Sequence, residues 1–264
     1  MRTARMQLCL LLAAALAVAL LLGACGESRE EAKTEEKPDG QAAEEKDVGK
    51  KSASAVMEAL EGEEPEAAKK LAAECVVRID VAGDEEQYYG SGVIWDHMDG
   101  RPIIVTAGHL LEEGEVLRIV FADGSACTGK VLGTAECADV GFVKAEWEEE
   151  RPAVSLHQRI FDTLDAYSAL FVIAGTQDGA GDVAMDAVLE ERAWYREEFG
   201  SDVMILRCRS GPGMSGGGVF DGYGHLVGLV AGGSGDRTAA LSMETLNDAY
   251  EEVCSRRRDT EAYS

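Results

Sequence analysis

One histidine, one aspartate and one serine in this sequence have the residue types and settings that could make a hydroxyl nucleophilic. Ser215 lies in the glycine-rich stretch RCRSGPGMSGGGVF, residues 207–220. Glycines at this density indicate tight turns or a backbone that another group approaches closely. A serine hydroxyl is a weak nucleophile at its ordinary pKa and needs a base nearby. The stretch is therefore either a surface loop or a nucleophile loop, and a suitable base would decide between them.

His109 is the best candidate for that base among the four histidines. It directly follows PIIVTAG, residues 102–108, a buried-type strand that ends in small residues. This setting places an imidazole on rigid backbone with room around it. His97 and His225 lie in predicted turns, and His157 lies in a polar connecting stretch. Taken alone, His109 would more often be a structural histidine, so a third residue has to support the assignment.

Asp139 is the candidate for the acid that orients the base. It immediately precedes a buried-type strand in ADVGFVKA, residues 138–145. A carboxylate at such a border is partly desolvated, which is costly unless the group pairs. A histidine N–H is a suitable partner, because this bond leaves the other ring nitrogen free to accept the serine proton. Asp123 is the competing acid, but its DGS context favours a turn.

Short β-type runs, separated by turn signals such as FADGS, surround these residues and predict the fold. The runs are CVVRIDV, YYGSGVIW, PIIVTAG, EVLRIVF, GKVLG and VGFVKA, and then SALFVIAG, DVAMDAVLEE, DVMILRC, GGVFD and HLVGLVAG. A polar stretch near residues 146–165 divides them into two groups of about six. This pattern predicts an all-β fold of two six-stranded antiparallel β-barrels, about residues 75–150 and 160–247. ETLNDAYEEVCSRR predicts a C-terminal helix.

The three residues together resemble the active site of chymotrypsin-like (trypsin-like) serine peptidases, especially the compact bacterial HtrA/Deg protease domain. TAGHL is similar to the family's T-A-A-H segment, ADVGFVKA to D-[IL]-A-L-L-K, and GMSGGGVF to G-x-S-G-G. Their order, His then Asp then Ser, is the family's order. Weaker similarity begins at YYGSGVIW, so the resemblance covers roughly residues 75–247. Only 49 residues follow Ser215, so we expect no C-terminal PDZ domain.

The resemblance implies a role for each residue. Ser215 would attack the scissile carbonyl, His109 would take its proton, and Asp139 would orient His109. The backbone N–H groups of Gly213 and Ser215 would form the oxyanion hole. The resemblance therefore implies that this chain is a serine endopeptidase. It would act on protein or peptide substrates through an acyl-enzyme, with no cofactor and no metal.

Departures from the family pattern leave a second interpretation open. GLVAGG stands where many members have G-I-V-S-W-G, so Ala231 lacks a hydroxyl and Gly232 lacks an aromatic side chain. The alternative is a catalytically inactive peptidase-fold lipoprotein that acts as a binding or scaffold protein. Arg209 lies six residues before Ser215, where trypsin-like members set P1 preference. It is either a determinant that favours acidic P1 side chains or a solvated strand end.

The first 25 residues predict export and lipid attachment. Arg2 and Arg5 precede LCLLLAAALAVALLL, an uncharged run of 15 residues that is typical of a signal peptide and short for a membrane span. LGAC, residues 22–25, resembles the bacterial lipobox, in which the cysteine is lipid-modified. We therefore expect a protein secreted across the bacterial cytoplasmic membrane and lipid-anchored on its outer face through Cys25. An ordinary cleaved secretory signal is the alternative.

Residues 26–74 predict an acidic disordered tether ahead of the peptidase domain, residues 75–264. Residues 26–50 are charged and nearly free of apolar side chains. Residues 53–74 are richer in alanine, glutamate and leucine and predict one or two short helices, with Pro65 opening the second. The formal charge of the whole chain, −24, disfavours charge-driven binding to nucleic acid, because phosphate would be repelled.

The seven cysteines do not predict a complete disulfide framework. Cys9 leaves with the signal and Cys25 is expected to carry lipid, so an odd number remains. Cys127 and Cys137 could bridge if their strands face each other. There is no C-x-x-C pair, which disfavours a structural zinc site.

Overall fold

The computed structural model describes residues 63–82, 87–111, 116–154 and 164–262. The predicted signal peptide, Cys25, most of the predicted tether and His157 lie outside these described residues. Within them, no helix combines the length and the apolar character that a membrane crossing requires.

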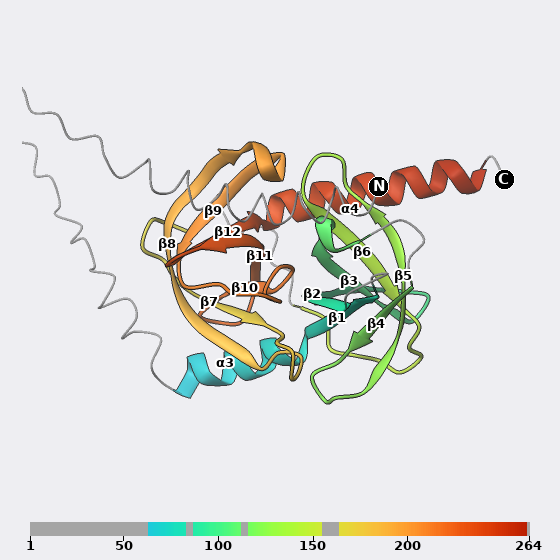
Figure 1. Cartoon of the computed structure of the whole chain (residues 1–264), viewed down its shortest axis with the longest axis horizontal. Helices are drawn as coiled ribbons and strands as arrows, with labels where there is room; N and C mark the ends of the chain where they lie inside the picture. The colour runs from blue at the N-terminus through green and yellow to red at the C-terminus, as the bar shows by residue number, and fades with distance from the viewer. Residues whose placement is uncertain (1–62, 83–86, 112–115, 155–163, 263–264) are drawn as a thin grey trace, which may run out of the picture.

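Two closed antiparallel β-barrels of six strands each form the molecule (Figure 1), which confirms the predicted fold class. The first barrel consists of β1 (Val76–Ala82), β2 (Gln87–Met98), β3 (Arg101–Ala107), β4 (Val116–Val120), β5 (Ala126–Thr134) and β6 (Val140–Ala145). The second consists of β7 (Ala169–Ala174), β8 (Val183–Arg196), β9 (Ser201–Arg207), β10 (Gly218–Asp221), β11 (Leu226–Ser234) and β12 (Arg237–Ser242).

The two barrels share one strand order. Around the first barrel the order is β1-β2-β3-β6-β5-β4, and around the second it is β7-β8-β9-β12-β11-β10. The loop that connects the third strand to the fourth therefore has the same place in each barrel, and so does the loop that connects the fifth strand to the sixth. The sequence shows no convincing internal repeat, because the shared feature is the order of strand pairing and not the side chains that form it.

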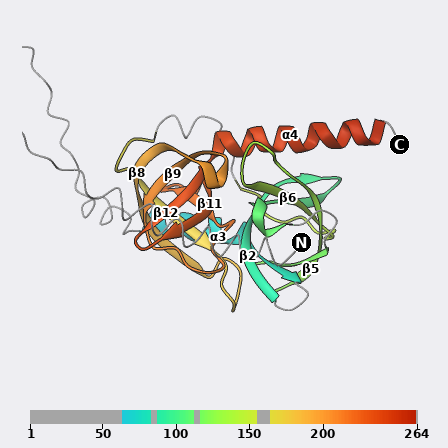
Figure 2. The same ribbon diagram turned by 45° about the horizontal axis from the view of Figure 1, so that its top comes forward.

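Two helices flank the barrels. α3 (Glu63–Glu74) packs against β7 and β1, with Ala68 and Ala72 buried. α4 (Met243–Ala262) begins beside the second barrel and runs across to the first, where it contacts β5 and β6 (Figures 1 and 2). α3 lies within the range assigned from sequence to the tether, so the ordered structure begins ahead of residue 75.

Three apolar clusters hold this arrangement together. One fills the first barrel around Ile79, Ile104 and Phe121, and a second fills the other barrel around Leu170 and Met204. The third lies between the barrels and under α4. Its larger side chains are Trp95, Phe142, Phe171, Phe220, Leu229, Leu241 and Leu246. Because both barrels bury side chains in this third cluster, residues at their junction are held on a rigid support.

Candidate active site

His109 lies in a short 3₁₀ turn, η1 (Gly108–Leu110), that directly follows the buried strand β3. The next two side chains anchor this turn. Leu110 fills the space beside Gly90 on β2, where a Cβ atom would come within 2.2 Å of Leu110 Cδ1. Leu111 packs in the same way against Gly141 on β6, at 2.5 Å. The imidazole itself stays 30% exposed, so the turn holds it at the surface on a fixed backbone.

Asp139 contacts His109 at two points. Its Oδ2 lies 2.7 Å from His109 Nδ1, and its Oδ1 accepts a hydrogen bond from the His109 backbone N–H at 2.7 Å. The carboxylate is 14% exposed. The backbone N–H of Asp139 donates to the carbonyl of Phe199 in η3 (Glu197–Phe199), which belongs to the second barrel. The acid is therefore held by groups from both barrels, and its contact with Nδ1 leaves Nε2 as the free ring nitrogen.

Ser215 lies in the second of two consecutive tight turns in the connection from β9 to β10. The first turn has Pro212 and Gly213 at its centre and is closed by the Met214 N–H on the Gly211 carbonyl at 3.2 Å. The second has Ser215 and Gly216 at its centre. Gly213 and Gly216 have φ values of +85° and +82°. A positive φ at the third residue defines a type II turn, which favours glycine there and proline just before it. Pro212 is thus a turn residue.

The amide groups of this loop fall into two kinds. The N–H groups of Met214, Gly216 and Gly217 donate to backbone carbonyls. The N–H groups of Gly213 and Ser215 have no acceptor among the described residues. Both residues are partly exposed, so these two donors are open to water or to a ligand. These two are the amides that the family resemblance assigns to an oxyanion hole.

The structure brings the base and the acid together but does not complete the contact to the serine. Within the described part of the chain, no hydrogen bond joins Ser215 Oγ to His109. The loop nevertheless lies beside the strand that carries the base. A Cβ atom at Gly216 would come within 2.4 Å of Thr106 Oγ1, three residues before His109. Such contacts are often open in ligand-free enzymes and close with substrate.

Ser91 on β2 holds the nucleophile loop and was assigned no role from sequence. It is fully buried. Its Oγ donates to the carbonyl of Gly213 at 2.7 Å, and its N–H donates to the carbonyl of Ser215 at 2.8 Å. Its own carbonyl accepts a bond from Thr106 Oγ1 at 2.6 Å. Only its place inside YYGSGVIW, a weak family match, draws attention to this position.

Phe199 lies beside Gly232, one of the two positions in GLVAGG that depart from the family pattern. Gly232 lies on β11, and a Cβ atom there would come within 3.4 Å of the Phe199 ring. The aromatic side chain that Gly232 lacks is thus replaced nearby by one from η3. Ala231 is 2% exposed and packs in the cluster between the barrels. The sequence could not reveal this replacement, because Phe199 lies 33 positions from Gly232 along the chain.

The other polar candidates have separate places. Asp123 lies in the predicted turn, where hydrogen bonds from Ser125 and then Arg151 lower its pKa to about 2. His225 lies in the predicted turn between β10 and β11, against Asp221. His97, expected in a turn, lies instead near the end of β2. Arg209 is exposed beyond the end of β9.

The two cysteines that the sequence suggested as a possible disulfide are not joined in the structure. Cys127 and Cys137 are both free in the structure. Burial, with the nearby Glu252 carboxylate, raises the pKa of the Cys137 thiol to about 11, so it is protonated at neutral pH. The part of the chain that the structure describes holds no cluster of three or more side chains suited to a metal ion.

Comparisons with known proteins agree with this fold. The family model described as a trypsin-like peptidase domain matches residues 90–229, which is more than half of the chain. Among solved structures, two of the HtrA-type protease AlgW with a tripeptide align with a TM-score of 0.63 and 18% identity. The alignment covers 72% of this chain and 63% of theirs, so this chain spans less than two thirds of their length. A comparison with curated protein sequences finds no match.

Proposed function

This chain belongs to the trypsin-like peptidase family, and from that premise we propose that it is an active serine endopeptidase tethered outside the cytoplasmic membrane. The observation that carries the proposal is the hydrogen bond that Asp139 Oδ2 accepts from His109 Nδ1, beside a loop with two free amides. A base with a fixed tautomer and a preformed anion cradle are the two costly parts of such a site.

The proposed reaction is acyl transfer. Ser215 Oγ attacks the scissile carbonyl carbon while its proton passes to His109 Nε2. The carbonyl oxygen becomes an anion that the N–H groups of Gly213 and Ser215 bind. His109 then gives the proton to the departing amine, and the C–N bond breaks to leave an acyl-serine. Water, deprotonated by His109, hydrolyses this ester and restores the hydroxyl. Asp139 stays ionised and stabilises the imidazolium of His109.

Covalent labelling tests the proposal. A fluorophosphonate probe should label the wild type, and Ser215→Ala should abolish labelling because the nucleophilic oxygen is gone. His109→Ala should reduce labelling by orders of magnitude, since the hydroxyl loses its base. The same variants should lose cleavage of casein. An unlabelled, correctly folded wild type would instead favour the inactive binding or scaffold lipoprotein, for which the altered residues Ala231 and Gly232 give a motive.

The lipid anchor is a separate part of the proposal and rests on the sequence alone. Lipid on Cys25 would hold the peptidase at the outer face of the membrane, and its partners there would be protein or peptide substrates and not nucleic acid. In cells fed a radiolabelled fatty acid, the wild type should incorporate label and fractionate with membranes. Cys25→Ser should do neither. A Cys25→Ser protein that stays in the membrane fraction with lipid attached would exclude this anchor.

A further inference from the structure

We propose that Ser91 is a positioning residue for the oxyanion hole, an inference that rests on the proposed function. Ser91 comes from β2 in the first barrel, and the loop that it holds comes from the second. It contacts no reacting atom in the proposed mechanism. Its effect is to set the direction in which the free amides of the loop point.

Ser91 forms three hydrogen bonds that depend on one another. Its hydroxyl donates its one proton to the Gly213 carbonyl at 2.7 Å. The same oxygen accepts the N–H of Gly175 at 2.9 Å. Its backbone N–H donates to the Ser215 carbonyl at 2.8 Å. Because a serine hydroxyl has a single proton, the donor from Gly175 leaves that proton committed to Gly213.

These bonds act on alternate peptide groups. The carbonyls that Ser91 holds belong to the peptide groups that follow Gly213 and Ser215. In both groups the N–H faces the opposite way: that of Met214 donates to the Gly211 carbonyl within the loop, and that of Gly216 donates to the Val230 carbonyl on β11. The N–H groups of Gly213 and Ser215 belong to the peptide groups that immediately precede these two, and they have no acceptor among the described residues. Ser91 thus fixes the neighbours on which the direction of the free donors depends.

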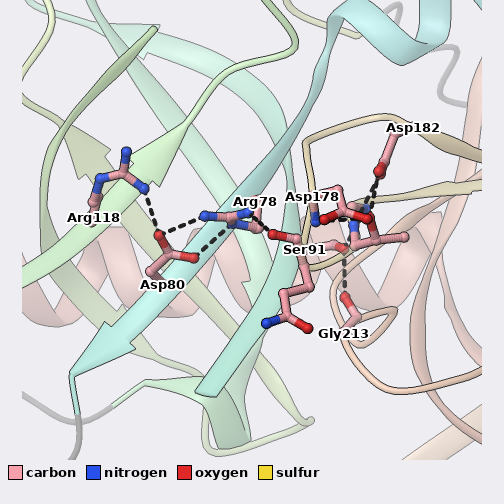
Figure 3. A network of polar contacts seen from close by, with 10 residues as sticks. Arg78, Asp80, Ser91, Arg118, Asp178, Asp182 and Gly213 are labelled. Carbon is pink, nitrogen blue, oxygen red and sulfur yellow. Dashed lines mark hydrogen bonds and ion pairs between the residues drawn. The ribbon is translucent and has the colours of Figure 1, made fainter. Parts of the chain in front are cut away.

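The position of Ser91 is itself held from the far side (Figure 3). Gly175, its donor, begins the loop that follows β7. Two residues on, the carbonyl of Gln177 accepts a bond from Arg78 on β1. Arg78 is in turn held by Asp80, which also pairs with Arg118. The polar chain from Asp80 to Gly213 therefore joins the two barrels at the loop that carries the nucleophile.

A steric contact makes the loop depend on Ser91 as well. A Cβ atom at Gly216 would come within 2.0 Å of the Ser91 carbonyl oxygen, so the two backbones touch directly. This contact fixes the distance between loop and strand, while the hydroxyl fixes the orientation of the Gly213 carbonyl. Removing only the hydroxyl should therefore keep the loop in place and free one peptide group to rotate.

Ser91→Ala tests the inference. We expect kcat for a peptide substrate, and the second-order rate of fluorophosphonate labelling, to fall by about 10- to 100-fold. KM should change by less than about twofold, because the free amides bind the developing anion more than the ground-state substrate. Ser91→Cys fills the space but bonds weakly, so it should stay impaired.

Ser242→Ala is the matched control for stability. Ser242 accepts the Thr245 N–H at the start of α4 and has no contact with the loop, so its loss lowers the melting temperature but not kcat. Full kcat in Ser91→Ala, or full rescue by Ser91→Cys, would overturn the inference while the proposed function stands. If Ser91→Ala does not fold, Ser91→Cys decides alone. A folded wild type without labelling would remove the proposed function and this inference with it.

Discussion

The two barrels use the same connection for different purposes. In the first barrel, the link from the third to the fourth strand carries His109, and in the second the same link carries Ser215. His109 follows its strand within two residues, on a 3₁₀ turn pinned by apolar side chains. Ser215 lies eight residues beyond β9, in the second of two glycine turns that hydrogen bonds hold in place. One link presents a side chain, whereas the other presents a hydroxyl and backbone amides.

The link from the fifth to the sixth strand differs in the same sense. In the first barrel it is a longer loop that ends in Asp139, beside the base. In the second it is a tight hairpin in which Gly235 has a φ of +64°. The first barrel therefore supplies ionisable side chains, and the second supplies the shaped backbone. We therefore expect the proposed function of His109 to depend most on the charge of Asp139. The conformation of the loop that carries Ser215 should depend most on its glycines.

The largest effect is expected from removing the charge in the first barrel. Asp139→Asn keeps the shape but turns an N–H toward His109, which favours the tautomer that cannot accept the serine proton. In serine proteases with this triad the corresponding change lowers kcat by about 10⁴-fold, and we expect a fall of the same order. Cleavage of a fluorogenic peptide library at neutral pH measures it.

Asp123→Asn serves as the comparison for that variant. Asp123 is the other acid considered from sequence, and it bonds to Ser125 and Arg151 on the surface. Its replacement should leave the cleavage rate within about twofold of the wild type, since it touches no group of the site. Equal losses in the two variants would mean that a general effect of charge, and not orientation of the base, explains the fall.

The next effect is expected from adding a methyl group to the second barrel's loop. Gly216→Ala places a Cβ atom against Ser91 O at 2.0 Å and strains a φ of +82°. We expect a loss of at least about 2 kcal/mol in the free energy of unfolding, together with loss of labelling. Urea unfolding and fluorophosphonate labelling measure both.

Gly108→Ala is the corresponding change in the first barrel. Its Cβ atom would lie 3.1 Å from both Asp139 Oδ1 and the backbone nitrogen of Val140, which is tight but well above the 2.0 Å at Gly216, and its φ is not positive. The cost should stay below about 1 kcal/mol, and labelling should persist. A Gly108→Ala variant as damaged as Gly216→Ala would end the distinction between the two links.

Sequence patterns predicted most of the strands and the contact between His109 and Asp139. Eleven of the twelve strands coincide with apolar runs, because half-buried strands must alternate or repeat apolar residues. β12, with the sequence RTAALS, was not among these runs, since alanine and serine carry little β preference. His109 and Asp139 were paired from sequence because each borders a buried strand, and the structure joins them at 2.7 Å.

Contacts between distant backbones could not be predicted in this way. Ser91 is 122 positions from the Gly213 carbonyl that it binds, and its own neighbours are glycines with no side chains to signal a partner. Phe199 acts on Asp139 through its carbonyl, which every residue possesses. The helix α3 is fixed to the barrels by alanines, whose small apolar surface resembles that of a solvated helix in sequence. Such roles depend on which segments meet, and only the fold determines that.

The smallest expected effect concerns two separate carboxylates, Asp80 in the first barrel and Glu190 in the second. Burial raises the pKa of Glu190, but hydrogen bonds from Arg237 and Arg207 outweigh it, and the pKa lies below its ordinary value. The pKa of Asp80 is lowered in the same way by Arg78 and Arg118. A lowered pKa in the folded state stabilises the fold above the unfolded pKa of about 4, and this contribution is lost as pH falls through the folded pKa.

Glu190→Gln should therefore be slightly more damaging than Asp80→Asn at neutral pH. Arg207 and Arg237 face each other directly across β9 and β12, so the loss of Glu190 leaves like charges opposed, whereas Asp80 itself faces Arg118. Each change should cost about 1 kcal/mol or less, because each carboxylate has an arginine partner that is about half exposed, Arg118 at 56% and Arg207 at 52%. Urea unfolding at pH 7 and pH 3 measures this, and both costs should shrink at pH 3. A cost that stays constant with pH would show that packing, and not charge, is what these carboxylates contribute.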